Sequence, residues 1–165
     1  MPDAAVHIIA ARDRAVIRLR SWRARSSSMS LVPPGLGGSM RLLALGSREW
    51  WGVSEHIVGP DLREELASHV AHEAMVAVDL SCAVKVLRIE GAAAREVLSK
   101  GCGLDLDSRT FPAGLCTRTR LANLPVVVDY IDPWPRFDLY VGRSHLTYLK
   151  SWLEDAALEF GGITY

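Results

Sequence analysis

Hydrophobic and polar positions alternate in several short segments of this chain, a pattern typical of half-buried β-strands. Across residues 14–20, alanine, isoleucine and leucine occupy alternate positions and arginines occupy most of the others. Residues 40–45 and 50–54 flank the polar sequence Gly-Ser-Arg-Glu, which predicts a β-hairpin. A buried strand is predicted at 75–80, and further strands at 84–90, 116–122, 126–131 and near 137–141.

Two segments have the periodicity of amphipathic helices with capping residues at their start. The earlier one follows Gly59-Pro60, with Asp61 as N-cap and Glu64 three residues later in the arrangement of a capping box. The later one has Ser144 as its N-cap and continues close to the C-terminus. Its apolar stripe, which predicts the face that packs on the core, consists of Leu146, Leu149, Trp152, Leu153, Ala156 and Phe160.

A shorter, alanine-rich helix is predicted from Gly91 to Ser99, and Gly101 is expected to end it in the left-handed conformation. Its start follows a strand, as phosphate-binding loops do, but has neither the GxGxxG nor the GxxxxGK[ST] spacing. Lys100 beside Cys102 could lower the pKa of the thiol, yet the sequence offers no recognisable base to complete a nucleophilic site. A lysine at a helix end followed by a packed cysteine is the simpler interpretation.

The predicted elements run as strands, a helix and strands in each half of the chain. This order favours an α+β fold, with antiparallel sheets and helices packed on one face, over alternating βαβ units. The chain has 165 residues, the length of one domain, so we expect a single domain over residues 1–165. Residues 21–39 are rich in Arg, Ser, Pro and Gly and are expected to form a flexible loop.

Charge and cysteine content narrow the function classes. Lys plus Arg and Asp plus Glu balance at 19 each, so no net positive field attracts nucleic acid or anionic lipid. The longest apolar runs are shorter than the ~20 residues that a membrane span needs. The three cysteines, Cys82, Cys102 and Cys116, fit neither a disulfide framework nor a zinc knuckle. These features favour a cytoplasmic protein.

A histidine pair at positions 69 and 72 is the remaining candidate for chemistry. The sequence His-Val-Ala-His-Glu places two imidazoles one helical turn apart but matches neither HExxH nor HxxEH. A solvent-facing pair near a helix end is the expected interpretation. The sequence thus predicts no catalytic, cofactor-binding or metal-binding residue in this chain.

Five tryptophans are many for a chain of this length. Trp50 and Trp51 are adjacent in a predicted strand, so their rings must point to opposite faces. Subunit interfaces are enriched in aromatic anchors. We therefore expect partner contacts from the outward-facing ring of this pair and from Trp134 in an Asp-Pro-Trp-Pro turn. The alternative, that these rings cover the chain's own sheet, stays open.

Several segments together resemble the gamma subunits of sarcosine oxidase. The resemblance covers roughly residues 40–153, and its motifs are fairly specific as a combination. Upstream, LGSREW at 45–50 is similar to the family's LGPDEW turn. The other matching segments are VDLS at 78–81, VLRIEG at 86–91, AREVLSKGCGLD at 94–105, FP at 111–112, TRLA at 119–122, and FDLYV at 137–141, which leads to Tyr148 and Trp152-Leu153.

This resemblance implies a fold related to the folate-binding domain of aminomethyltransferases and a non-catalytic role in a heterotetramer. The complex would convert sarcosine to glycine, with tetrahydrofolate as one-carbon acceptor. The implied partners are an alpha chain with NAD and a folate-binding domain, a beta chain with flavins (FAD and FMN), and a small delta chain with zinc. The family pattern assigns no cofactor to the gamma chain.

Two alternatives remain beside this hypothesis. The first is a stand-alone, folate-dependent protein of the aminomethyltransferase type, which would need an acidic residue at the reactive nitrogens of the folate. The second is a gamma subunit of a related N-methyl amine oxidase. The sequence does not separate sarcosine from other N-methyl amines, because a beta-type chain would select the substrate.

Overall fold

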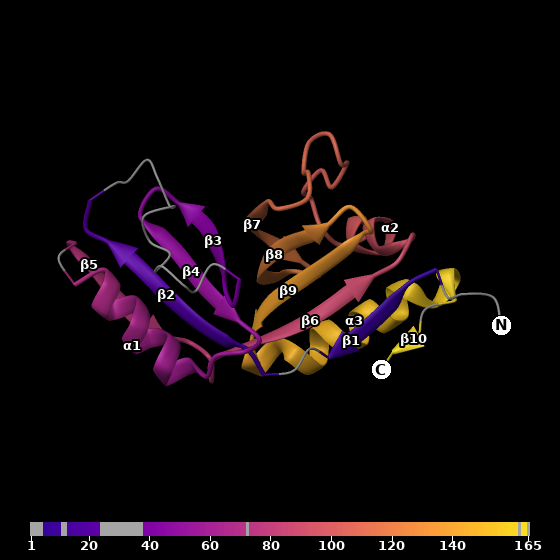
Figure 1. Ribbon diagram of the computed structural model, residues 1–165. Helices are drawn as coiled ribbons and strands as arrows, with labels where there is room; N and C mark the ends of the chain where they lie inside the picture. The colour runs from indigo at the N-terminus through magenta and orange to yellow at the C-terminus, as the bar shows by residue number, and fades with distance from the viewer. Residues whose placement is uncertain (1–4, 11–12, 24–37, 72, 162, 165) are drawn as a thin grey trace. The chain divides into compact units, whose positions relative to one another are not determined.

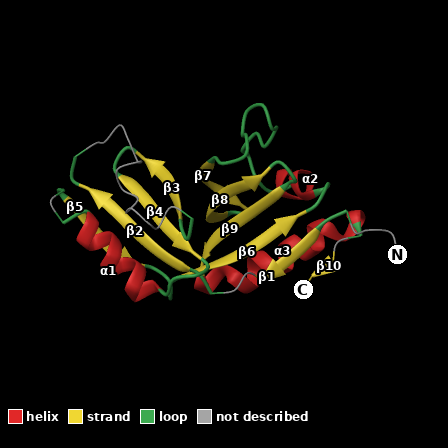
Figure 2. Cartoon of the chain, viewed as in Figure 1, coloured by secondary structure: helices red, strands yellow, loops and turns green. Residues whose placement is uncertain are grey.

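The computed structural model describes residues 5–10, 13–23, 38–71, 73–161 and 163–164. The chain divides into two compact units, one formed by Met1–Ala11 with Lys85–Tyr165 and the other by Arg12–Val84. Each unit combines one β-sheet with helices, so the predicted α+β class is confirmed (Figures 1 and 2). We name them the six-stranded unit and the four-stranded unit. Residues 24–37, most of the expected flexible loop, lie outside the described residues.

The four-stranded unit has strand order β3-β4-β2-β5, and each neighbouring pair is antiparallel. Helix α1 lies against one face of this sheet, where Leu62 and Leu66 pack with Ile17, Leu19 and Trp50. The predicted strand at 14–20 and the hairpin that follows it are confirmed. The elements are β2 (Ala15–Ser21), β3 (Arg41–Gly46), β4 (Glu49–Ser54), α1 (Gly59–His69) and β5 (Met75–Asp79).

Three details of this unit differ from the sequence predictions. Strand β2 is more buried than the alternation predicts at Val16, which is inaccessible, although Arg20 on the same face is exposed. Strand β5 lies at the sheet edge, and Val76 is 40% exposed, so the segment is not a buried strand. Helix α1 begins at Gly59, and no side chain caps it, so the capping box at Asp61 is wrong. Proline suits this first turn because the turn needs no N–H there.

The six-stranded unit has strand order β10-β1-β6-β9-β8-β7. The pairs β1–β6, β7–β8 and β8–β9 are antiparallel, whereas β1 and β10 are parallel. The hydrophobic pattern does not predict the short strands β1 and β10. The elements are β1 (His7–Ala10), β6 (Val84–Glu90), α2 (Ala94–Ser99), β7 (Cys116–Leu121), β8 (Leu124–Asp132), β9 (Arg136–Gly142), α3 (Leu146–Ala157) and β10 (Ile163–Thr164).

Helices α2 and α3 share one apolar core with the inward-facing side chains of this sheet. The predicted stripe of α3 is confirmed, since all six of its members belong to this core or pack against it. The predicted cap at Ser144 is wrong, because a 3-10 turn over Arg143–His145 precedes the helix. The aromatic rings of Tyr130 and Phe137 stack at 4.6 Å beneath the guanidinium of Arg95.

Position 101 requires glycine because a larger side chain would not fit there, and not because the chain ends the helix in a left-handed conformation. Its φ is not positive, so the predicted conformation is wrong. A Cβ at this position would lie 2.4 Å from Cζ2 of Trp152, a ring that packs against the core. The glycine therefore lets α3 approach the chain that follows α2.

We expect Gly101→Ala to lower the free energy of unfolding by about 1–3 kcal/mol, because overpacking must displace the Trp152 ring. Gly103→Ala is the matched control, since a Cβ there meets nothing within 4 Å. Chemical denaturation of both variants measures the difference. Equal stability of the two would show that the ring moves without cost.

Candidate interaction surface

The contacts of Lys100 and Cys102 indicate that both residues have a structural role. Lys100 donates a hydrogen bond from Nζ to the carbonyl of Ala156 at 2.5 Å and pairs with Glu159. The same ammonium lies 4.8 Å from the ring centroid of Phe160. Lys100 is thus directed to the end of α3, where a cation suits the helix dipole. The thiol of Cys102 is buried and lies 3.6 Å from Thr119 Oγ1.

The histidine pair is only partly described. His69 lies in the last turn of α1, and His72 is outside the described residues. Among the residues that the structure describes, no three His, Cys, Asp or Glu side chains gather closely enough to hold a metal ion.

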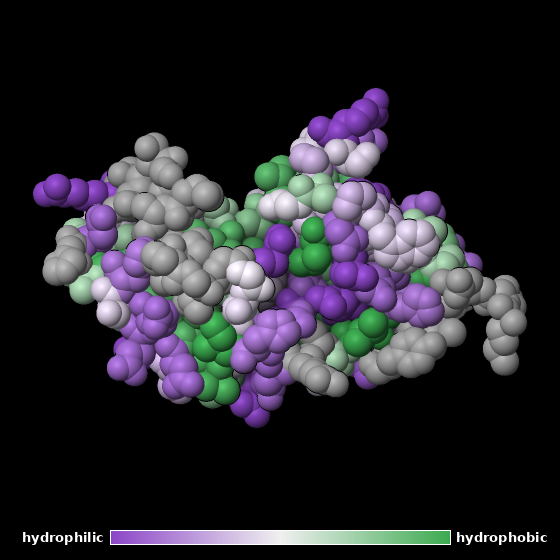
Figure 3. Space-filling model, viewed as in Figure 1, coloured by the Kyte–Doolittle hydropathy of each residue, from purple (hydrophilic) through white to green (hydrophobic). Residues whose placement is uncertain are grey.

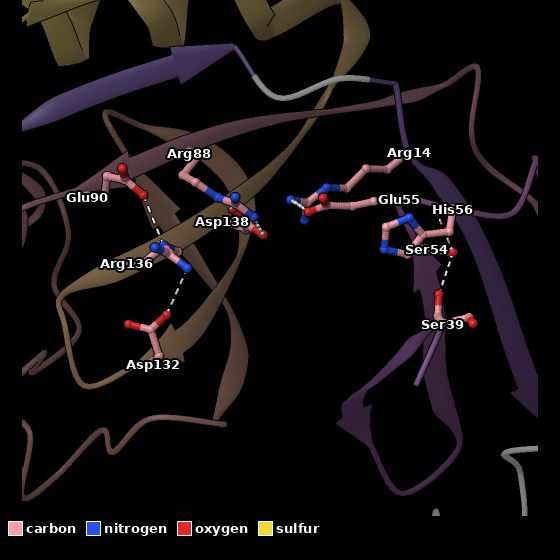
Figure 4. A network of polar contacts seen from close by, with 10 residues as sticks. All are labelled: Arg14, Ser39, Ser54, Glu55, His56, Arg88, Glu90, Asp132, Arg136 and Asp138. Carbon is pink, nitrogen blue, oxygen red and sulfur yellow. Dashed lines mark hydrogen bonds and ion pairs between the residues drawn. The ribbon is translucent and has the colours of Figure 1, made fainter. Parts of the chain in front are cut away.

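A row of charged side chains crosses the middle strands of the six-stranded unit on the face away from its helices. We call this row the charged lane. Arg88 on β6 forms a two-pronged ion pair with Asp138 on β9, with Nε–Oδ1 and Nη2–Oδ2 distances of 2.8 and 3.1 Å (Figure 4). Asp138 is fully buried, and so is Asp129, its direct cross-strand neighbour on β8. The two carboxyl groups therefore lie directly opposite each other, and the guanidinium of Arg88 supplies the counter-charge for Asp138.

Arg136 continues this lane to the ends of the strands. Its Nε donates to Glu90 Oε2 at 3.0 Å, and its Nη1 lies 3.0 Å from Asp132 Oδ2 (Figure 4). The backbone N–H of Gly91 donates to the carbonyl of Pro135 at 3.0 Å. One guanidinium and one backbone hydrogen bond therefore hold the turn between β8 and β9 against the end of β6.

The structure separates the tryptophans that the sequence proposes as partner contacts. Trp50 belongs to the core of the four-stranded unit. Trp51 faces the other way, but its ring is buried and its indole N–H donates to Glu49 Oε1 at 3.2 Å. The expectation of an outward-facing hairpin ring is therefore wrong for Trp51. Trp134 is 64% exposed at the tip of the turn held by Arg136, and Trp22 is 69% exposed.

A second polar network, in the four-stranded unit, supports the chain after β4. Arg14 is buried and pairs with Glu55 (Figure 4). The hydroxyl of Ser54 donates to the carbonyl of Ser39 at 2.6 Å and accepts the backbone N–H of His56 at 3.1 Å. These contacts join the start of β3 to the end of β4, which makes this network structural.

The loop between α2 and β7 projects from the six-stranded unit, and its tip is hydrophilic (Figures 1 and 3). Leu106 and Phe111 anchor it in the core, while the side chains between them are exposed. At the tip, the side-chain hydrogen bond from Arg109 lowers the pKa of Asp107 from 3.8 to about 2. The Arg109 Nε–Asp107 Oδ1 distance is 2.9 Å.

Comparison with known proteins places this arrangement in a family. Residues 26–159 match the model of the family described as "Sarcosine oxidase, gamma subunit family". The chain belongs to the sarcosine oxidase gamma subunit family. It is 34% identical over 115 residues to the sarcosine oxidase subunit gamma of Corynebacterium sp. (strain P-1). That match covers 67% of this chain and 56% of the relative, so this family member spans little more than half of the curated protein.

Comparison with solved structures supports the same family. A chain of the heterotetrameric sarcosine oxidase from Corynebacterium sp. U-96, in complex with pyrrole 2-carboxylate, matches with a TM-score of 0.83 and 26% identity. The match covers 99% of this gamma-family chain and 89% of that one. Aminomethyltransferase T from Bartonella henselae matches with a TM-score of 0.68 at 12% identity, over 98% of this chain and 48% of that one. The aminomethyltransferase-like fold is thus confirmed. Among the described residues, no helix is long and apolar enough to cross a membrane.

We expect Asp138→Asn in this gamma-family chain to lower the free energy of unfolding by about 3 kcal/mol, because it removes the buried carboxylate that pairs with the Arg88 guanidinium. Asp107→Asn is the matched control, since Asp107 forms a similar pair with Arg109 at an exposed site. Surface pairs contribute little, so its melting temperature should change little. Equal shifts for both variants would contradict the assigned role of burial.

The carboxyl of Asp107 should titrate with a midpoint near pH 2 in the folded chain. Since the folded pKa lies below the unfolded value, the contribution of this group to stability is present above about pH 4 and lost as the pH falls toward 2. In Arg109→Ala the midpoint should rise toward 3.8, the ordinary value. Carbon-detected NMR titration of the carboxyl measures both, and an unchanged midpoint in the variant would refute the Arg109 contact.

Proposed function

We propose that this chain is the cytoplasmic gamma subunit of a heterotetrameric oxidase that demethylates sarcosine, and that it contributes contacts but no catalytic group. The observation that carries the proposal is the fold match to a chain of a heterotetrameric sarcosine oxidase over 99% of this sequence. The family match over residues 26–159 supports it. In this proposal the whole chain acts as one functional unit.

The polar groups of the six-stranded unit support a scaffolding role. Lys100, Arg88 and Arg136 each form an ion pair within the six-stranded unit. A rigid charge network of this kind fixes a surface in place. In this proposal FAD, FMN, NAD, tetrahydrofolate and zinc are held by the alpha, beta and delta chains.

The proposal predicts that the four chains, when produced together, purify as one assembly in equal ratio and oxidise sarcosine to glycine with formation of hydrogen peroxide. Omission of the gamma chain should reduce the yield of assembled complex. Measured alone, the gamma chain should carry no flavin absorbance and no stoichiometric zinc, and calorimetry should detect no binding of tetrahydrofolate.

Three outcomes would contradict this proposal. Separate elution of the gamma chain would exclude a subunit role. Binding of tetrahydrofolate or flavin by the isolated chain would favour the stand-alone, folate-dependent alternative. An assembly that oxidises dimethylglycine but not sarcosine would favour the related N-methyl amine oxidase.

A further inference from the structure

The turn between β8 and β9 presents a large aromatic ring to solvent. Trp134 is 64% exposed, although tryptophan is highly buried on average in folded proteins. Pro133 and Pro135 flank it on both sides. Tryptophan is also enriched among the few residues that dominate binding energy at interfaces.

The turn is held in one place before any partner binds. Arg136 bridges Glu90 and Asp132 at 3.0 Å each, and the N–H of Gly91 donates to the carbonyl of Pro135. Because proline fixes φ, the two prolines further restrict the backbone on either side of Trp134. A group that is already ordered loses less conformational freedom on binding, which favours its use as an anchor.

The charged side chains beside the Trp134 ring indicate which charge a partner's surface would carry. Glu90 and Asp132 supply two carboxylates and Arg136 supplies one guanidinium, so this clamp has a net charge of −1. A cationic side chain next to an apolar pocket would complement this charge and the exposed ring.

We propose that Trp134 anchors this chain to a larger chain of the oxidase by entering an apolar pocket bordered by lysine or arginine. The inference rests on the proposed function, since it takes the partner from the same assembly. Arg136 acts as a positioning residue that keeps the ring in its binding orientation, and the net negative charge of the clamp attracts the partner's cation.

The test is a binding titration of the full-length chain onto an immobilised complex of the alpha, beta and delta chains, with a thermal melt of every variant. Trp134→Ala should weaken affinity by about 30-fold or more with an unchanged melt, and Trp134→Phe should recover part of the loss. Trp22→Ala is the matched control, because this ring is equally exposed and lies outside the clamp. Its affinity should equal that of the unmodified chain.

Two further variants separate positioning from contact. Arg136→Gln should weaken affinity by about 5-fold to 10-fold, mainly through faster dissociation, because the ring loses its fixed orientation. Asp132→Asn should reduce the dependence of affinity on salt concentration, whereas Trp134→Ala should leave that dependence intact.

Failure of the inference can be told from failure of the proposed function. If the unmodified chain does not bind the other three chains, the proposed function is wrong. If it binds, and Trp134→Ala binds equally well or Trp22→Ala weakens binding as much, the anchor assignment is overturned. A Trp134→Ala variant that loses affinity only together with its melt, while Trp134→Phe binds normally, also overturns it.

Discussion

Burial of carboxylates on the middle strands of the six-stranded sheet is the constraint on which this half of the molecule depends. Asp138 and Asp129 lie opposite each other on adjacent strands and are both inaccessible to solvent. A buried charge is tolerated only when it is paired, and Arg88 supplies a two-pronged partner for Asp138 from the neighbouring strand. A shift of one residue in either strand would turn these groups to the apolar, helix-covered face. The pairing therefore fixes the register of β6 and β9.

The same charged lane also holds the turn between β8 and β9, which exposes Trp134. Arg136 extends it to the strand ends, where it joins Glu90 to Asp132 across the turn that carries Trp134. The helix-covered face supplies stability through its apolar core, while the opposite face uses charge to hold one exposed ring in place. A sheet with one face for stability and the other for an exposed ring suits a subunit that acts through contacts with other chains.

The sequence predicts those features that depend on local periodicity. The alternation at residues 14–20, the following hairpin and the apolar stripe of α3 all arise from neighbours within a few positions, and the structure has each of them. The family resemblance further identified the fold. The exposed site at Trp134 also followed from local chemistry, since tryptophan between two prolines cannot continue a strand.

The remaining features depend on parts of the chain that are distant in sequence. Gly101 is explained by Trp152, which no local pattern brings close to it. The exposure of β5 follows from strand order, and the burial of Trp51 likewise cannot be derived from its own strand. The pairing of Arg88 with Asp138 joins positions 50 residues apart, so sequence alone does not distinguish them from surface charges. The predicted caps at Asp61 and Ser144 are wrong, because α1 begins two residues before Asp61 and a 3-10 turn that includes Ser144 precedes α3.

In the proposed function, this chain brings a preformed surface, centred on the turn between β8 and β9, to a larger assembly. Hydrogen–deuterium exchange of the free chain and of the assembled complex tests it most directly. Amides of β6, β8 and β9 should already be protected in the free chain, whereas the amide of Trp134, which lies between two prolines without an N–H, should gain protection only on assembly. A free chain without a protected sheet, or a turn whose exchange is unchanged in the complex, would contradict the claim.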